Sequence, residues 1–318
     1  MSRPKQHSSL DVVVAGLAVV DIIGKPVDLE HPPKKGGLQV IDTIKMTTGG
    51  NVSNVGIDLC RLGFKVGAVT RIGNDSLGKV LLQQYEEHGM DCSGITTDDQ
   101  AQTSATIVSV DDRGERTFLH TRGAVANFRR ADIERHLDLI NRSSFLVVGY
   151  LGLMQELESE LPGLLRAVKK AKNIPIFLDT GGVPRRMDKK ELNELLSAVD
   201  YFIPSLEEAI ALTGKQTPEE ITKFLVDAAG QKTYGVKLGE QGCYVATASH
   251  SGIVPPRNVK EVVDTTGAGD AFVAGFVAAT LRGHDPFEAA RLGNAIAASC
   301  VTALGASTAI RAFEEYAG

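Results

Sequence analysis

Short apolar runs alternate with stretches of helical periodicity along almost the whole chain of 318 residues, and this alternation is the strongest constraint on its fold. Runs such as 11–17 (DVVVAGL) have the length and composition of strands buried on both faces of a sheet. Stretches such as 50–63 instead carry valine and leucine at helical spacing and end in glycine. Strands that alternate with helices predict an α/β fold, with a mostly parallel sheet covered by helices on both faces.

The alternation supplies a full set of predicted elements. The predicted strands cover residues 11–17, 65–70, 145–149, 174–179, 200–203, 233–238 and 243–247. The predicted helices cover residues 50–63, 76–89, 156–172, 189–198, 206–213, 218–229, 268–282, 286–303 and a short segment near 309–316. No internal repeat, low-complexity tract or clear linker divides them, so residues 1–318 are expected to form a single domain.

Two regions depart from this rhythm. Residues 22–47 are rich in Pro, Gly, Lys and Thr and contain short extended pieces such as 38–45. Residues 103–119 alternate in polarity around the turn 111–114 (DDRG), which predicts a hairpin. Together these regions predict a small β-sheet lid attached to the α/β body, with lid segments at about 22–47 and 101–122.

Composition excludes several classes of function. The formal net charge is −5 and no basic run exceeds a pair, which argues against a nucleic-acid partner. No apolar run reaches membrane-spanning length, and the polar segment 1–9 lacks the apolar core of a secretion signal. The four cysteines form no C-x-x-C pair and no zinc-like cluster, as expected of reduced thiols. These features predict a cytoplasmic protein without nucleic-acid or membrane partners.

The most informative segment is 264–275, in which the small residues Gly267, Ala268 and Gly269 precede an apolar helical stretch. Small side chains leave backbone N–H groups free to face an anion at a helix N-terminus, where the helix dipole also favours negative charge. Asp270 follows at once, where a carboxylate can take a proton from an attacking hydroxyl. An ordinary helix start with an acidic first turn fits the same residues.

Other segments also have two interpretations. Residues 49–54 (GGNVSN) suit close approach of a polar ligand, or an asparagine-capped helix. Asp21, which follows the first predicted strand, is also explained as a solvated loop acid. Residues 204–208 (PSLEE) fit a serine-capped helix, and residues 237–242 (KLGEQG) fit a hairpin turn. Residues 73–79 almost match a phosphate-binding P-loop, but Val80 stands where Ser or Thr must bind Mg²⁺.

Two of these segments resemble the signatures of the ribokinase-like (PfkB) carbohydrate kinase family. Residues 264–270 resemble its DTxGAGD signature, and residues 49–54 with 59–63 resemble GGxxxN followed by LxRLG. The resemblance extends over about residues 11–310. It implies a Rossmann-like α/β body with a β lid over the sugar site. It also implies an ATP-dependent kinase that phosphorylates a hydroxyl, expected to be primary, of a sugar or sugar-like molecule.

The resemblance also implies roles for individual residues. Asp270 would be the general base, and Gly267, Ala268 and Gly269 would form the anion hole. The substrate would contact the residues Asp21, Gly50, Asn51 and Asn54. Ribokinase has lysine where this chain has Asn51, so the resemblance does not imply ribose.

The nucleotide and metal positions follow in the same way. ATP would lie near Lys237, Gly239, Gly242 and Asn294. Glu208 would organise Mg²⁺ through water, although Ser205 replaces the family's asparagine and Lys237 its threonine. A monovalent cation such as K⁺ would bind at Asp264, Thr266 and Gly305.

Several alternatives remain open from the sequence. A nucleoside or sugar phosphate would suit the same family, and Lys25, Lys34, Lys35 and Arg122 would suit a second phosphate or carboxylate, or are simply exposed lid charges. A catalytically silent sugar or nucleotide sensor would need no base. An NAD-dependent oxidoreductase is disfavoured because residues 16–21 lack the G-x-G-x-x-G pattern. Exposed strand edges at 38–45 and 103–119 predict a homodimer through the lid.

Overall fold

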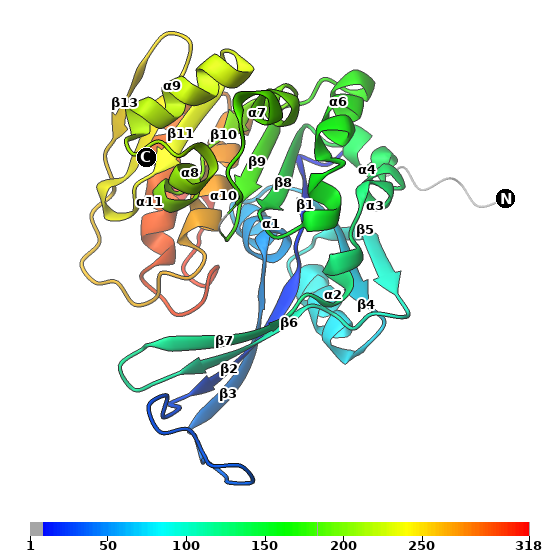
Figure 1. The fold of residues 1–318 in the computed structure, drawn as a ribbon, viewed down its shortest axis with the longest axis vertical. Coiled ribbons are helices and arrows are strands. Elements are labelled where there is room, and N and C mark those ends of the chain that lie inside the picture. The colour runs from blue at the N-terminus through cyan, green and yellow to red at the C-terminus, as the bar shows by residue number, and fades with distance from the viewer. Residues whose placement is uncertain (1–8, 183, 318) are drawn as a thin grey trace, which may run out of the picture.

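The computed structural model describes residues 9–182 and 184–317, and within them the body is built on one nine-stranded sheet (Figure 1). Its strands are β1 (Val12–Gly16), β4 (Val66–Gly73), β5 (Asp91–Asp98), β8 (Phe145–Leu151), β9 (Ile176–Thr180), β10 (Tyr201–Phe202), β11 (Thr233–Lys237), β12 (Cys243–Ala246) and β13 (Ser251–Val254). They lie in the order β13-β12-β11-β10-β9-β8-β1-β4-β5. From β11 to β5 neighbouring strands are parallel, whereas β12 and β13 are antiparallel additions at one edge.

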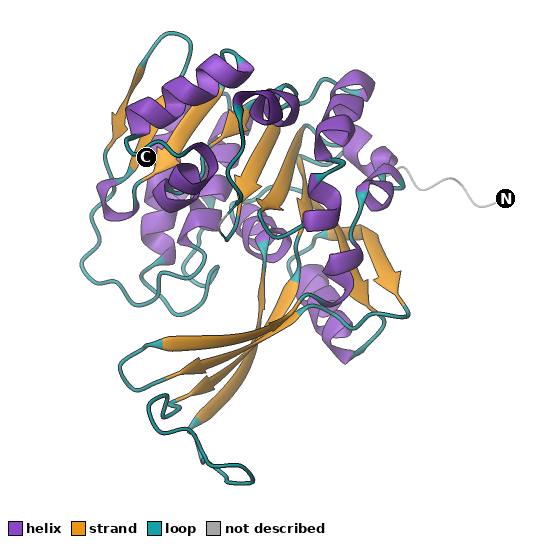
Figure 2. Cartoon of the chain, viewed as in Figure 1, coloured by secondary structure: helices purple, strands orange, loops and turns teal. Residues whose placement is uncertain are grey.

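Helices cover both faces of this sheet and bury an apolar core on each (Figure 2). The sequence of strand β1 is apolar throughout because both of its faces are buried: Val12 and Val14 pack in one core, and Val13 and Ala15 pack in the other. The first core is covered by α1 (Asn51–Arg61), α2 (Ser76–Glu87), α10 (Ala268–Leu281) and α11 (Pro286–Cys300). The second is covered by α3 (Arg130–Glu134), α4 (Leu137–Asn141), α5 (Gln155–Glu158), α6 (Leu161–Ala171), α7 (Lys189–Leu196), α8 (Leu206–Thr213) and α9 (Pro218–Ala229).

A second, four-stranded sheet projects from this body within the described residues (Figure 1). Its strands are β2 (Val19–Lys25), β3 (Thr43–Gly49), β6 (Ala105–Val110) and β7 (Arg116–Thr121), in the order β3-β2-β6-β7. Asp21 lies opposite Thr106, which lies opposite His120, so these polar residues share one face. Ile107 and Leu119, one residue along, lie opposite each other on the other face. We call this sheet the lid.

The structure confirms the predicted α/β class with its mostly parallel sheet and small lid. Two predicted helices are wrong in detail. The helix expected at 156–172 is two helices, because Pro162 lacks an N–H and suits the first turn of the new helix α6. The segment near 309–316 forms only a single 3₁₀ turn, Phe313–Glu315.

Three further differences concern the strands. The sequence does not predict β5 or β13, which are edge strands with largely polar or partly exposed residues and therefore lack an apolar run. The extended piece expected at 38–45 is strand only from Thr43. In the segment 103–119 the outer strand is β7, whereas β6 is paired on both sides.

The remaining general expectations concern thiols and membranes. In the described part of the chain, Cys60, Cys92, Cys243 and Cys300 are all free thiols. None of the helices in this part combines the length and apolar character needed to cross a membrane. Residues 1–8, most of the polar segment considered above, lie outside the described residues.

Candidate active site

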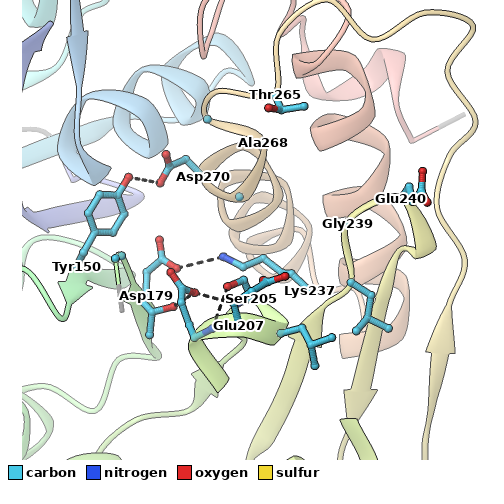
Figure 3. A pocket seen from close by; sticks show the side chains of 18 of the residues that line it. Tyr150, Asp179, Ser205, Glu207, Lys237, Gly239, Glu240, Thr265, Ala268 and Asp270 are labelled. Atoms are coloured by element: carbon cyan, nitrogen blue, oxygen red, sulfur yellow. Dashed lines mark hydrogen bonds and ion pairs between the residues drawn. The ribbon is translucent and has the colours of Figure 1, made fainter. Parts of the chain in front are cut away.

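A cleft of about 770 Å³ opens at the carboxyl ends of the parallel strands (Figure 3). Tyr150 of β8, Thr180 of β9 and Lys237 of β11 reach it from three strands. The N-terminal turns of α8 and α10 complete its wall. Ligands of open α/β sheets bind at this edge, where strand ends and helix N-termini meet. The cleft therefore has the position expected of an active site.

Asp270 lies in the first turn of α10 and points into this cleft (Figure 3). The phenol of Tyr150 donates a hydrogen bond of 2.7 Å to its Oδ1, and the amide of Asn54 donates one of 2.8 Å to its Oδ2. Burial raises the pKa of Asp270, and these two hydrogen bonds oppose the rise. The carboxylate is thus fixed in one orientation and keeps basic character.

Two neighbouring groups lie so close to the glycine turn before Asp270 that they restrict the side chains it can carry. Gly267 caps α10 with φ of +78°, and a Cβ at this position would lie 2.4 Å from the Cβ of Ala306. A Cβ on Gly269 would lie 3.4 Å from the Nζ atom of Lys237. The turn therefore lies between the 305–306 loop and an ammonium group, and the helix begins here with N–H groups that have no intrahelical acceptor.

Lys237 belongs to a compact cluster of buried charges. Its Nζ atom lies 3.4 Å from Oδ1 of Asp179. Burial alone would lower the pKa of Lys237, but the carboxylates of Asp179 and Glu208 raise it. Burial raises the pKa of Asp179 to about 7, although the ammonium group of Lys237 acts in the opposite direction. Lys237 is thus held as a cation beside the glycine turn. An anion bound at this turn would share the ammonium group with the carboxylates of the cluster.

Glu208 lies in the first turn of α8, close to this cluster. Its Oε2 atom accepts hydrogen bonds from the backbone N–H of Ser205 at 2.8 Å and from the hydroxyl of Thr180 at 2.6 Å. Ser205 returns the contact by accepting from the N–H of Glu208 at 3.3 Å, so serine caps this helix where the family has asparagine. Glu207 also lines the cleft. Within 9–182 and 184–317, no three His, Cys, Asp or Glu side chains form a ready metal site.

The predicted substrate residues fall into two groups. Asp21 lies on β2 in the lid, where a Cβ on Gly49 would come within 2.6 Å of its Oδ2. Burial raises the pKa of Asp21, whereas Thr106 and His120 lower it. Asn54, as described above, bonds to Asp270.

Gly50 and Asn51 instead contact the backbone at the end of β1, around Ala15 and Leu17. Gly50 has φ of +83°, and a Cβ there would lie 2.4 Å from the carbonyl oxygen of Leu17. The side chain of Asn51 is fully buried. Its Oδ1 accepts from the N–H of Leu17 at 2.8 Å and its Nδ2 donates to the carbonyl of Ala15 at 3.1 Å. The side chain of Asn51 therefore anchors the end of β1.

The predicted nucleotide residues are also divided. Lys237 and Gly239 line the cleft. Gly242 lies behind it, where a Cβ would come within 2.3 Å of the carbonyl oxygen of Val254. Asn294 donates from Nδ2 to the carbonyls of Val254 and Pro255 at 3.1 and 3.0 Å, and so supports the segment that follows β13.

Asp264, Thr266 and Gly305 come together as predicted, but their polar groups face a side chain from the lid. Oδ1 of Asp264 accepts from Nη2 of Arg116 at 2.8 Å and from the N–H of Thr266 at 3.0 Å. Oδ2 accepts from the N–H of Gly305 at 3.0 Å. Nη1 of Arg116 lies 2.5 Å from the hydroxyl oxygen of Thr266.

Sequence reasoning missed Tyr150, Asp179 and Arg116. Two of them had a usable signal, because Tyr150 directly follows the predicted strand 145–149 and Asp179 ends the predicted strand 174–179. Residues at the carboxyl ends of parallel strands meet at one edge. Arg116 had no such signal, since its partners lie about 150 residues away and are reached only through the fold.

Comparisons with known proteins agree with this geometry. The family described as "pfkB family carbohydrate kinase" matches residues 9–312. A 2-dehydro-3-deoxygluconokinase of Bacillus subtilis is 29% identical over 296 residues, covering 89% of each chain. A ribokinase of Haemophilus influenzae is 31% identical over 295 residues, covering 91% of this chain and 92% of its own.

The solved structures extend the likeness to three dimensions. The structure of Arabidopsis thaliana ribokinase complexed with ribose and ATP has a TM-score of 0.83 at 26% identity, covering 97% of this chain and 98% of that one. The match thus includes the lid as well as the body. Since the family match also runs through both sheets, the protein belongs to the pfkB family of carbohydrate kinases and is an enzyme of that class.

Proposed function

We propose that this enzyme transfers the γ-phosphoryl group of ATP to a hydroxyl, expected to be primary, of a sugar-like molecule, with Asp270 as the general base. The observation that carries the proposal is the geometry of Asp270, which two donors fix at the positive end of α10 inside the cleft. A carboxylate in this position can take the proton of an attacking hydroxyl while backbone N–H groups hold the phosphate beside it.

The phosphate side of the reaction is assigned to the glycine turn and to Lys237. The N–H groups of residues 267–269 would supply donors at a helix N-terminus that stabilise negative charge on the transferring group, although that of Ala268 also donates to the carbonyl of Thr265 at 3.3 Å. The Lys237 ammonium, which lies against Gly269, adds a full positive charge. Gly239 would border the rest of the nucleotide along the same wall of the cleft.

The sugar side is assigned to the polar face of the lid and to the start of α1. Asp21 would accept hydrogen bonds from substrate hydroxyls. Asn54 would hold Asp270 in position while it faces the reacting hydroxyl. Gly50 would contribute through its backbone, because its positive φ keeps the chain close to Leu17. The lid would exclude water and so limit hydrolysis of ATP.

The residues present also fit Mg²⁺. Asp179 and Glu208 border the cleft near Lys237, and Mg²⁺ typically takes one or two carboxylates together with water and substrate phosphates. Among the described contacts of Glu208, Oε2 is engaged by Ser205 and Thr180, so Oε1 would face a metal-bound water. The metal would neutralise charge on the ATP phosphates.

A coupled assay for ADP release tests the proposal. The panel contains aldoses and ketoses, sugar acids, sugar phosphates and nucleosides, each with ATP and Mg²⁺ and with a control that lacks the acceptor. We expect ADP release that depends on at least one acceptor. ATP binding without turnover of any acceptor would instead indicate a sugar or nucleotide sensor and would reject the kinase assignment.

A further inference from the structure

In the described part of the chain, the side chain of Arg116 links the lid to the phosphate side of the body. This residue begins β7, the outer strand of the lid, on the same face as His120. Its guanidinium contacts both Asp264 and Thr266, with N–O distances of 2.8 and 2.5 Å. The Asp264 side chain is 5% exposed, whereas that of Arg116 is 33% exposed, so the pair lies at the boundary between lid and body.

Asp264 connects this contact to the anion hole. The same carboxylate accepts from the N–H of Thr266, which precedes the capping residue Gly267, and from the N–H of Gly305. Gly267 in turn lies directly against Ala306. The segment before Gly267 and the 305–306 loop, which together shape the glycine turn, are therefore both hydrogen-bonded to Asp264, and Asp264 is in turn bonded to Arg116 of the lid.

A monovalent cation does not fit among these side-chain groups while Arg116 occupies them. Oδ1 of Asp264 already has two N–H donors, Oδ2 has one, and the hydroxyl of Thr266 faces the guanidinium. A second positive charge at this distance from a guanidinium would be repelled. Burial would raise the pKa of Asp264, but Arg116 and the N–H of Thr266 lower it to about 2, so the carboxylate is charged, and both of its oxygens accept hydrogen bonds.

We propose that Arg116 supplies, from the lid, the positive charge at Asp264 where the sequence predicts a monovalent cation, and that it thereby acts as a positioning residue for the anion hole. This proposal rests on the proposed kinase function. Its consequence is that the phosphate site is completed only when the lid covers the sugar site. The conformation of residues 264–267 then depends on the position of the lid. Phosphoryl transfer is therefore coupled to the exclusion of water by the lid.

The test compares Arg116→Ala with a matched control in the same hairpin. Arg113→Ala removes an arginine whose described ion pairs are with exposed Glu30 and with Asp111, neither of which lines the cleft. For Arg116→Ala we expect kcat to fall about 10-fold or more, as for loss of charge-assisted hydrogen bonds, with little change in the KM for the sugar. Arg113→Ala should retain the wild-type kcat.

The cation dependence distinguishes positioning from simple stabilisation. We expect the wild-type rate to agree within about twofold in K⁺ and in a bulky organic cation. In Arg116→Ala, K⁺ or free guanidinium should restore part of the lost rate, because either ion can then reach Asp264. Arg116→Met, which keeps the aliphatic stem, replaces the alanine variant if the latter fails to fold.

Three results would overturn the proposal: a wild-type enzyme that needs K⁺, an Arg116 variant with normal kcat, or an Arg113 variant as impaired as the Arg116 variant. Failure of the kinase function is a different result, namely no turnover of any acceptor by the wild type. In that case the proposal is tested by the rise in Tm on adding ATP and Mg²⁺. The rise should be smaller in Arg116→Ala and be restored by K⁺, and an equal rise in both proteins would reject the proposal.

Discussion

At the scale of single residues, the carboxylate of Asp270 is the group that, in the proposed mechanism, separates a kinase from a binding protein on this fold. Replacing Asp270 with Asn preserves size and most hydrogen bonding but removes the base. We expect kcat to fall by about 10²–10⁴-fold, the contribution of a positioned general base. ATP affinity, measured by calorimetry, should change little, because the proposed phosphate-binding groups are the backbone N–H groups of the glycine turn and the ammonium of Lys237, not the carboxylate of Asp270.

A matched control is Asp285→Asn, which alters an exposed acidic residue that caps the start of α11 and does not line the cleft. Its turnover should stay close to wild type. If Asp270 were merely a helix-cap residue, both variants would lose a little stability and keep their activity. An Asp270→Asn enzyme within about threefold of the wild-type kcat would therefore reject the base assignment.

Tyr150 donates one hydrogen bond of 2.7 Å to Asp270, the proposed base. This bond lowers the pKa of Asp270 against the effect of burial, so its loss in Tyr150→Phe should raise that pKa. Since the base acts when deprotonated, the acidic limb of the kcat/KM profile should move to higher pH, and kcat should fall about 10-fold.

The control for this prediction is Tyr234→Phe, which removes a buried phenol bonded only to a backbone carbonyl, that of Gly230, among the described residues. Its pH profile should match that of the wild type. An unshifted acidic limb in Tyr150→Phe would show that the tyrosine does not act on the base.

At the scale of elements, α1 carries an unusual buried carboxyl group. Asp58 is fully buried, and neither carboxylate oxygen has a hydrogen-bond partner among the described residues. Burial raises the pKa of Asp58 well above its usual value, and the nearby carboxylate of Asp270 adds to this rise, whereas Ser307 and Arg61 oppose it. The ionised form is thus a cost to the folded state, of the order of 1–3 kcal/mol for an unsatisfied buried group.

We predict that Asp58→Asn raises the Tm, and that the gain grows with pH. The folded wild type retains a proton that the unfolded chain releases above its pKa of about 4, so wild-type stability falls as pH rises from there to the folded pKa. Asn cannot ionise and avoids this loss. Melting at pH 5 and pH 8 measures the effect, and a Tm gain that shrinks with pH would contradict it.

Asp132→Asn is the control of opposite sign. Asp132 is also buried, but it forms a 2.8 Å ion pair with Arg71. Removing this charge should destabilise the protein, because the guanidinium of Arg71, whose side chain is 22% exposed, loses this ion pair. The two substitutions together separate the cost of burying a carboxylate from the benefit of pairing it.

The elements also show which parts of the fold the sequence can predict. Strands such as β1 are apolar because both faces are buried, so the sheet was predictable from local pattern. The edge strand β5 was not, because exposed edges need no apolar run. Likewise, the contiguous 264–270 segment marks half of the site, whereas Tyr150, Asp179 and Arg116 join it only when distant elements fold together.

At the scale of the whole molecule, the lid has two chemically different faces. The face that carries Asp21 and Arg116 lies toward the body, as the contact of Arg116 with Asp264 requires. The opposite face exposes four apolar side chains: Ile44 at 72%, Met46 at 52%, Ile107 at 51% and Leu119 at 72%. Cross-strand pairing places Met46, Ile107 and Leu119 in one row across the sheet, through Ile22 of β2. A contiguous apolar face of this kind marks an interaction surface.

We therefore predict that two copies of the chain associate through this face of the lid, which refines the homodimer expected from its strand edges. Light scattering should give the mass of a dimer for the wild type and of a monomer for Ile107→Lys combined with Leu119→Lys, because a buried unpaired lysine opposes association. Ile253→Lys, at an equally exposed apolar position on the body, should remain dimeric. A wild type that stays monomeric at high micromolar concentration would reject the prediction. Dimerisation that survives both lid lysines would place the interface elsewhere, since two charges within the apolar row leave too little apolar surface to hold the lids together.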